Sequence, residues 1–311
     1  LRRLAVLFAF GLAHALLVWS GDVLHHYAVL GLALLALRKV PRRWLFALIV
    51  AAFLVPQGVR LYRTATSTPE ARAEREAFVV QMRARANAAY AGGSYVEAVK
   101  VRAAETKSLT VGRPLEGLNW LMSLTVTILL GLHFGRERLI ERAAELGPFW
   151  ARLQRWSLAL GLGSGLLAAA CGWNLRPGQP TMLGFASGLF FELSRPTLML
   201  FYASTIVRFC VRRPHAPWLA TVAAAGRMPL TNYLMQSVLC TLIFYGYGLG
   251  LYGKTPPLTF LAIAAAVWGL EVVWSRWWLR HFLFGPAEWL WRTLSYGAWL
   301  PARRRVPAGA E

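Results

Sequence analysis

Three histidines and one aspartate lie close together near the start of the chain, and imidazoles beside a carboxylate can perform general acid–base catalysis. Asp22 and His25 are three residues apart, a spacing that places them on one face of a helix. A carboxylate that fixes the tautomer of an imidazole makes that histidine an effective general base. We therefore predict His14 or His25 as the base and Asp22 as the orienting group. His26 points elsewhere on the helix and is the weaker candidate.

The elements that must position these residues are two apolar runs, residues 4–19 and 23–37, joined by the short turn Ser20-Gly21-Asp22. Such a short turn predicts an antiparallel hairpin of two membrane-spanning helices. At 1.5 Å per residue, the three imidazoles then reach similar depths just inside one face of the membrane. Two plainer roles stay open. His14 could bond the backbone of a neighbouring helix, and Asp22 stands where the second helix needs an N-cap.

Composition favours a membrane protein. Of the 311 residues, 57% are hydrophobic, and several nearly uncharged runs approach 20 residues. A bilayer core about 30 Å thick needs about 20 residues per helix. We predict an all-α, polytopic transmembrane bundle that forms a single domain over residues 1–311 in the lipid bilayer. Its eight spanning helices are expected at residues 4–19, 23–37, 44–62, 115–134, 156–173, 181–211, 228–249 and 258–278.

The net charge of +20 could indicate a nucleic-acid partner, but its distribution argues against one. Basic residues concentrate in 2–3, 38–43, 136–155, 208–227 and 276–305, whereas the opposite short loops hold only Arg176 and Lys254. Cytoplasmic loops of membrane proteins carry such an excess of Lys and Arg. We therefore expect a multi-pass protein of the bacterial cytoplasmic (inner) membrane, with both ends cytoplasmic and the histidine cluster facing outward.

Two segments are expected to lie outside the spanning helices. Residues 63–113 predict an extracytoplasmic insertion of two amphipathic helices lying on the membrane face. The first would begin with Pro69 at its first position, and the second with a capping box from Ser94 to Glu97. Residues 280–311 form a basic and aromatic cytoplasmic tail.

A second group of ionisable residues lies in the middle of the run 181–211. Glu192 and Arg195 are three residues apart and can neutralise each other, which is the plainer interpretation. Pro196 removes a backbone donor and predicts a break in the helix there. A broken helix with charges near the bilayer midplane is also typical of substrate sites in transporters.

Amides and cysteines complete the candidate groups. Asn232 and Gln236 are four residues apart, so they share one helix face, where amides either bind a ligand or hold helices together. The three cysteines have no shared spacing, which favours neither a disulfide framework nor a zinc motif. We expect no metal site.

Three motifs resemble the bacterial YeiB-like membrane proteins, a family described as a domain of unknown function. The first is Gly-Leu-x-His14 followed by Trp19-x-Gly21-Asp22-x-Leu24-His25-x-Tyr27-Ala. The second is Gly-Arg-Met-x-Leu-Thr231-Asn232-Tyr233-x-x-Gln236-Ser237. The third runs from Trp277 to Tyr296 and includes Phe284-Gly285-Pro286-x-Glu288-Trp289-Leu-Trp291-Arg292. Together the motifs extend over almost the whole chain.

The resemblance implies a function. By remote similarity the family is grouped with the transmembrane acyltransferases, which include the lysosomal heparan glucosaminide acetyltransferase. An acyl group would then pass from cytosolic acyl-CoA, a co-substrate and not a covalently bound cofactor, to an extracytoplasmic glycan or lipid acceptor. Tyr27 joins Glu192, Arg195, Asn232 and Gln236 as candidate substrate-binding residues. Family members normally begin with two further membrane segments, the first with an Asp-x-x-Arg-Gly-type motif, which we expect to precede residue 1.

Two alternatives to an enzyme stay open. A permease or flippase for a small or lipidic substrate would use the charge pair in the predicted broken helix. A non-catalytic membrane scaffold would need none of these groups.

Overall fold

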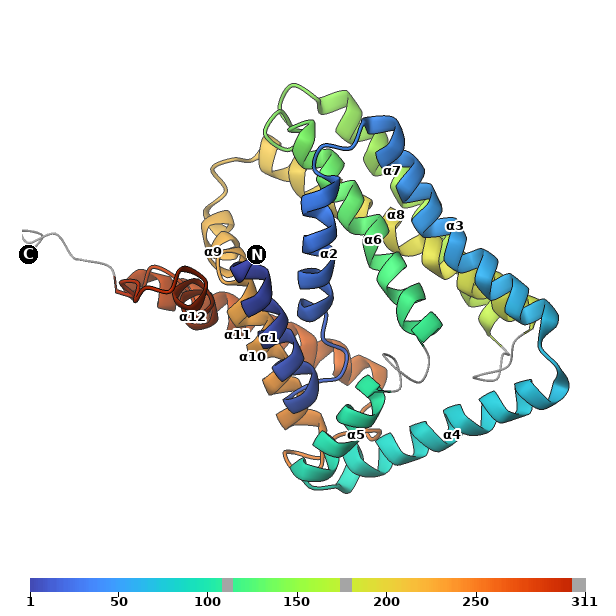
Figure 1. Cartoon of the computed structure of the whole chain (residues 1–311). Coiled ribbons are helices and arrows are strands. Elements are labelled where there is room, and N and C mark those ends of the chain that lie inside the picture. The colour runs from blue at the N-terminus through green and yellow to red at the C-terminus, as the bar shows by residue number, and fades with distance from the viewer. Residues whose placement is uncertain (108–113, 174–180, 304–311) are drawn as a thin grey trace, which may run out of the picture. The chain divides into compact units, whose positions relative to one another are not determined.

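The computed structural model describes residues 1–107, 114–173 and 181–303, and these residues form twelve helices and no named strand (Figure 1). The all-α prediction is therefore confirmed. In chain order the helices are α1 Arg2–Leu17, α2 Leu24–Leu37, α3 Arg42–Thr66, α4 Pro69–Gly92, α5 Tyr95–Lys107, α6 Pro114–Arg136, α7 Gly147–Gly172, α8 Met182–Arg212, α9 Pro217–Gly226, α10 Pro229–Phe244, α11 Pro257–His281 and α12 Pro286–Tyr296.

The helices belong to two compact units, where the sequence predicts one domain. The first unit contains Leu1–Leu32, Arg85–Ser108 and His215–Glu311. The second contains Ala33–Ala84 and Leu109–Pro214. The histidine cluster therefore belongs to the first unit, and the Glu192 and Arg195 pair belongs to the second.

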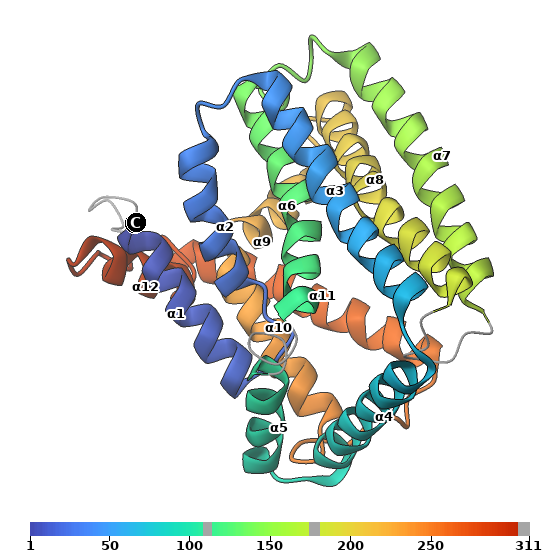
Figure 2. The ribbon, with the colours of Figure 1, turned by 45° about the vertical axis from the view of Figure 1, so that its right-hand side comes forward.

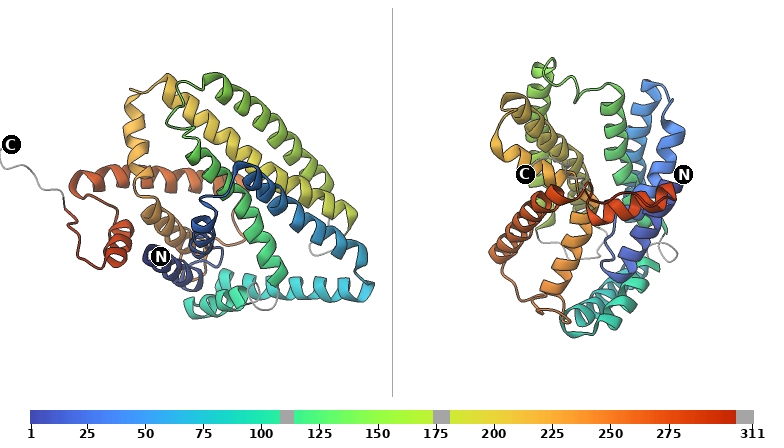
Figure 3. Two further views of the ribbon diagram at one scale, coloured as in Figure 1. Left: turned by 45° about the horizontal axis from the view of Figure 1, so that its top comes forward. Right: turned by 90° about the vertical axis from the view of Figure 1, so that its left-hand side faces the viewer.

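The first unit packs α1 against α5 and α12. Figure 3 shows α12 beside the start of α1, where the indole of Trp291 donates to the Arg3 carbonyl at 3.0 Å. At the other end of α1, the Leu17 carbonyl accepts bonds from Arg102 at 2.5 Å and from the Tyr95 hydroxyl at 2.9 Å. The last carbonyls of a helix lack hydrogen-bond partners within that helix. Residues of α5 therefore satisfy the last carbonyl of α1, just before the turn that contains Asp22.

In the second unit, α7 lies alongside α8 (Figures 1 and 2). A Cβ atom added at Gly161 would lie 2.8 Å from the Leu198 side chain, so glycine permits this close approach, as expected for helices packed in a membrane. The predicted start of this helix at residue 156 is wrong, because α7 begins at Gly147. Pro148 suits the first turn, and the arginines that follow are good helix formers.

The predicted break at Pro196 is also wrong, because α8 is one continuous helix of 31 residues that contains this proline. Neighbouring hydroxyls donate to backbone carbonyls around it. The hydroxyl of Thr197 bonds the Leu193 carbonyl at 2.7 Å, and that of Ser194 bonds the Phe191 carbonyl at 2.8 Å. These bonds add to the backbone bonds of the helix, in which Pro196 removes only the donor to the Glu192 carbonyl.

The predicted count of eight spanning helices is not supported. Of the described helices, two are long and apolar enough to cross a membrane, α3 and α11. The helices α1, α2 and α10 have 16, 14 and 16 residues, fewer than a bilayer core requires. In the most apolar stretches of α3 and α11 only 22% of the residues are buried. A core helix of a soluble protein would be mostly buried, so these two helices present apolar faces outward.

The region expected to form two amphipathic helices contains α4 and α5. Pro69 is the first residue of α4, as predicted. The capping box is confirmed as well. The backbone N–H of Ser94 donates to Glu97 Oε2 at 2.7 Å, and the Glu97 N–H donates to Ser94 Oγ at 3.3 Å. Both helices are therefore set by local sequence, while their position on a membrane face stays a prediction.

Candidate active site

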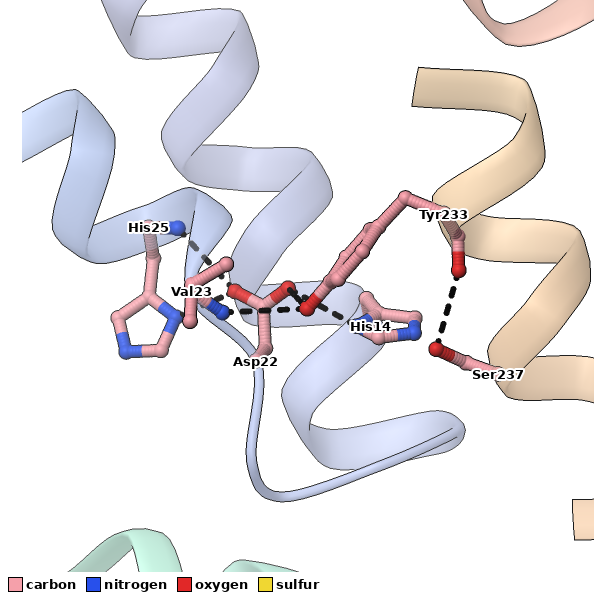
Figure 4. A network of polar contacts seen from close by, with 6 residues as sticks. All are labelled: His14, Asp22, Val23, His25, Tyr233 and Ser237. Atoms are coloured by element: carbon pink, nitrogen blue, oxygen red, sulfur yellow. Dashed lines mark hydrogen bonds and ion pairs between the residues drawn. The ribbon is translucent and has the colours of Figure 1, made fainter. Parts of the chain in front are cut away.

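Asp22 is the centre of the candidate site. It lies in the turn between α1 and α2 and is only 1% exposed. Its carboxylate is bonded by four groups on three elements (Figure 4): His14 Nδ1 at 2.9 Å, His25 Nδ1 at 2.7 Å, the His25 backbone N–H at 3.1 Å and the Tyr233 hydroxyl at 3.1 Å. The structure thus brings together all three residues predicted to be catalytic. The bond from the His25 N–H also gives Asp22 the predicted capping role.

This arrangement fixes the protons on the two imidazoles. An ionised carboxylate can only accept hydrogen bonds, so His14 and His25 both donate from Nδ1, and the neutral form of each ring has its lone pair on Nε2. The Nε2 atom of His14 is buried and has no hydrogen-bond partner among the residues that the structure describes. In Figure 4 this edge of the ring is turned toward α10. Of the two histidines, His14 is therefore the better placed candidate for a general base.

His25 is the more exposed of the two imidazoles, with 15% of its side chain accessible. Its ring centroid lies 3.8 Å from that of His26. In Figure 4 the His25 ring lies on the side of Asp22 away from α10. His25 therefore supports Asp22, and its own Nε2 faces a different environment from that of His14.

The electrostatic state of Asp22 follows from these contacts. Burial alone would raise the pKa of the carboxyl. The hydrogen bonds from His14 and His25 outweigh burial and hold the pKa of Asp22 well below its usual range. The group is therefore ionised at neutral pH, as an acceptor for two imidazoles must be.

Two further residues of the site come from α10 and were not predicted. The Tyr233 hydroxyl donates to Asp22 and accepts from the Val23 backbone N–H at 3.2 Å. Its ring centroid lies 5.2 Å from that of His14. Ser237, one turn later, donates to the Tyr233 carbonyl at 3.1 Å. Both residues occur in the second sequence motif with i,i+4 spacing, and that spacing is the signal that could have identified them.

The tail segment holds α10 in place. The buried Glu288 of α12 accepts from the Leu230 and Thr231 backbone N–H groups at 2.6 and 3.0 Å, and from the Thr231 hydroxyl at 2.5 Å. These amides belong to the first turn of α10, where backbone N–H groups have no acceptor within the helix. The helix dipole also favours a negative charge at this end. Glu288 thus fixes the helix that presents Tyr233.

Gly11 allows α1 and α2 to meet at the site. A Cβ atom at this position would lie 2.2 Å from the His25 backbone nitrogen and 2.7 Å from Asp22 Oδ2. We expect Gly11→Ala to lower the free energy of unfolding by about 1–3 kcal/mol, a typical cost of overpacking. Denaturant unfolding of the purified protein measures it. Gly269→Ala on α11, where a Cβ meets nothing within 4 Å, is the control. Equal stability of the two variants would contradict the close approach.

An open cavity of about 850 Å³ lies beside the cluster in the first unit. Tyr233 and Ser237 form part of its wall, so Tyr233 contacts both Asp22 and the cavity. The predicted substrate-binding residue Gln236 also lines it.

The other predicted binding residues of the first unit do not line this cavity. Asn232 is buried, and its amide donates to the Ala225 carbonyl at 3.1 Å and to Ser275 Oγ at 3.0 Å. It joins α9, α10 and α11, which is the structural role left open by the sequence. Tyr27 lies on α2 with 43% of its surface exposed.

Glu192 and Arg195 form a separate cluster in the second unit. They are paired at 3.3 Å, and Ser123 donates to Glu192 at 2.7 Å. Glu192 lines a small cavity of about 150 Å³ together with Gln57, Arg60 and Ser123. The predicted charge pair is present, and it is surrounded by polar groups of its own.

Comparison with known proteins identifies the family. A family model described as "Protein of unknown function (DUF418)" matches residues 134–298. The uncharacterized protein YxaH of Bacillus subtilis (strain 168) is 31% identical, over 98% of this chain and 73% of its own length. The uncharacterized protein YeiB of Escherichia coli (strain K12) is 32% identical, over 96% of this chain and 76% of its own length. The chain belongs to the DUF418 family.

The DUF418 assignment confirms the resemblance to YeiB-like proteins. An uncharacterized 39.9 kDa protein of Bacillus acidopullulyticus is also similar, with 28% identity over 56% of this chain and 52% of its own length. No solved structure matches the chain. The DUF418 match includes α10 and α12, which carry Tyr233 and Glu288, while His14 and Asp22 precede it.

Proposed function

We propose that this DUF418 protein is a membrane-embedded acyltransferase that moves an acyl group from acyl-CoA to an acceptor hydroxyl or amine. One observation carries the proposal. His14 is bonded through Nδ1 to a buried carboxylate. Its Nε2 has no hydrogen-bond partner in the described part of the chain and faces the helix that lines a large cavity. An imidazole held in this tautomer is suited to remove a proton from a hydroxyl group.

The proposed reaction requires the thioester end of acyl-CoA to pass through the bundle to His14. His14 Nε2 takes the proton of the acceptor hydroxyl while the acceptor oxygen forms a bond to the thioester carbonyl. The carbon–sulfur bond then breaks, and the thiolate of CoA leaves with the proton that His14 returns. Asp22 stabilises the transient imidazolium, and Tyr233 holds the carboxylate in position.

The donor would bind through its phosphates. Arg136 of α6 donates to the carbonyls of Val40 and Arg38, both at 2.8 Å, and so joins two basic segments of the second unit. Guanidinium groups are effective phosphate ligands. These segments are the proposed cytoplasmic site for CoA.

The proposed location is the bacterial cytoplasmic membrane, with a multi-pass topology and both ends cytoplasmic. The exposed apolar faces of α3 and α11 support insertion into lipid, because soluble proteins rarely expose such continuous surfaces. The charge asymmetry of the loops supports the orientation.

The first test is acyl transfer in proteoliposomes that contain the full chain and radiolabelled acetyl-CoA, with bacterial lipid and glycan extract as acceptor. We expect His14→Ala to reduce transfer by about 10²-fold or more, the contribution of a general base. His215→Ala, an exposed histidine of the first unit, is the control. Wild-type transfer by both His14→Ala and His25→Ala would remove the proposal. A melting temperature that does not change at saturating coenzyme A would rule out acyl-CoA as the acyl donor.

The transporter alternative has lost its main support, because α8 is not broken. Its remaining support is the Glu192 cluster. Counterflow in proteoliposomes that is abolished by Glu192→Gln would favour transport over acyl transfer.

A further inference from the structure

The cavity beside His14 has an aromatic lining that suits a hydrocarbon chain. Its wall includes Trp19, Phe244, Tyr245, Tyr252 and Phe260. Its volume of about 850 Å³ lies within the range of small-molecule sites, which are mostly apolar with a few polar groups that fix orientation. The ligand therefore gains most of its binding free energy from burial of apolar surface.

The charge of the lining excludes one class of ligand. Among the described residues that line the cavity, none carries a formal charge. The phosphates of CoA need arginine or lysine partners, and a desolvated anion without one is costly. The cavity therefore does not suit the acyl donor, and an uncharged ligand fits it better.

The polar groups of the lining are concentrated on α10. Tyr233, Gln236, Ser237 and Thr241 all come from this helix, and Tyr233 is bonded to the carboxylate that orients His14. In Figure 4 the open edge of the His14 ring faces the same helix. A ligand with one polar end would place that end against α10, near the proposed base.

The cavity is continuous with apolar surface that is open to the surroundings. Phe260 lines it and is 44% exposed on α11, one of the two helices suited to cross a membrane. Trp19 lines it as well and is 43% exposed. A ligand that is itself dissolved in the bilayer can reach the cavity along these side chains, without passing through water.

We infer that this cavity binds an uncharged amphiphile, a hydrocarbon chain that ends in a hydroxyl group, and that this amphiphile is the acyl acceptor. The role as acceptor rests on the proposed acyltransferase function, whereas binding of the amphiphile rests on the cavity alone. The substrate class is thus a membrane-dissolved alcohol and not a water-soluble sugar.

Cys240 allows a direct test, because it lines the cavity while Cys171 and Cys210 lie in the second unit. The full chain in phosphatidylcholine nanodiscs is treated with N-ethylmaleimide, and modification of each cysteine is followed by mass spectrometry. At a concentration about ten times its Kd, 1-dodecanol should slow modification of Cys240 roughly tenfold by mass action. Modification of Cys171 and Cys210 should not change. N-acetylglucosamine should protect none of them.

Filling the cavity provides a second measurement. Thr241→Trp and Gln236→Trp each place a large side chain in the cavity, and both should abolish protection of Cys240 by 1-dodecanol. Gln236 is exposed, so its variant keeps the test valid if the buried Thr241 variant does not fold. Leu242→Trp on the exposed side of α10 is the matched control and should retain protection.

The outcomes separate this inference from the proposed function. Three results would overturn the amphiphile site. They are equal protection of all three cysteines, no protection of any cysteine, and protection of Cys240 that persists in both cavity-filling variants. Protection of Cys240 without any acyl transfer to 1-dodecanol would leave the binding site standing and overturn its role as the acceptor site. His14→Ala should retain protection while losing transfer.

Discussion

The Asp22→Asn variant should transfer acyl groups about 10⁴-fold more slowly than the wild type, as expected for a carboxylate that sets the tautomer of a catalytic histidine. The wild-type carboxylate accepts from both His14 and His25. His14 bonds Oδ1 and His25 bonds Oδ2, so an asparagine, which has an NH₂ group in one of these two positions, cannot accept at both. His14 would then carry its proton on Nε2 in part of the population and could not act as a base.

The measurement is the rate of acyl transfer in proteoliposomes with equal amounts of folded protein. Glu141→Gln, which neutralises an exposed carboxylate in the second unit, is the control and should keep full activity. If Asp22→Asn retained more than about a tenth of wild-type activity, the tautomer argument would fail.

The same residue should make stability depend on pH. The pKa of Asp22 is lowered in the folded protein, because the bonds from His14 and His25 outweigh burial, so the unfolded chain binds a proton more readily. Stability from the ionised carboxylate is therefore fully present above the unfolded pKa of about 3.9 and is lost as pH falls below it toward the folded pKa. Between about pH 5 and pH 3, the wild type should lose more stability than Asp22→Asn. Parallel unfolding curves would contradict this linkage.

The Glu288→Ala variant should lower the free energy of unfolding by about 3 kcal/mol or more. Glu288 is buried and satisfies two backbone N–H groups and one hydroxyl at the start of α10. Each donor left unsatisfied in a buried position costs about 1–3 kcal/mol. Because α10 presents Tyr233 to Asp22, acyl transfer should decrease as well.

Denaturant unfolding measures this effect, and Glu145→Ala is the control. Glu145 forms a surface ion pair with Arg142 at 3.0 Å and is 67% exposed in its side chain. Such pairs contribute about 0–1 kcal/mol. Similar losses in the two variants would show that the Glu288 contacts do not stabilise α10.

Local sequence was sufficient to predict several features of the fold and of the candidate site. The capping box from Ser94 to Glu97 and the start of α4 at Pro69 depend on residues within one helical turn, and both are confirmed. The cluster of His14, Asp22 and His25 could also be predicted, because a short turn brings the adjacent ends of the two helices close together.

Long-range contacts could not be predicted in the same way. Tyr233 meets Asp22 from 211 positions along the chain, and no local pattern predicts that contact. The break at Pro196 was wrong because a proline removes a single backbone bond, which is not enough to break the 31-residue α8. The count of spanning helices was wrong in part because some apolar runs form helices too short to cross a bilayer, such as the 14 residues of α2.

The bond between Glu288 and the first turn of α10 also sets an order of assembly during biosynthesis. A ribosome releases His14 and Asp22 before α10, and α10 emerges before the residue that holds its amino end. Nascent chains that stop before residue 288 should therefore contain the imidazoles and the carboxylate while Tyr233 is not yet fixed. A segment that is made later thus completes the surroundings of a carboxylate and imidazoles that are made earlier.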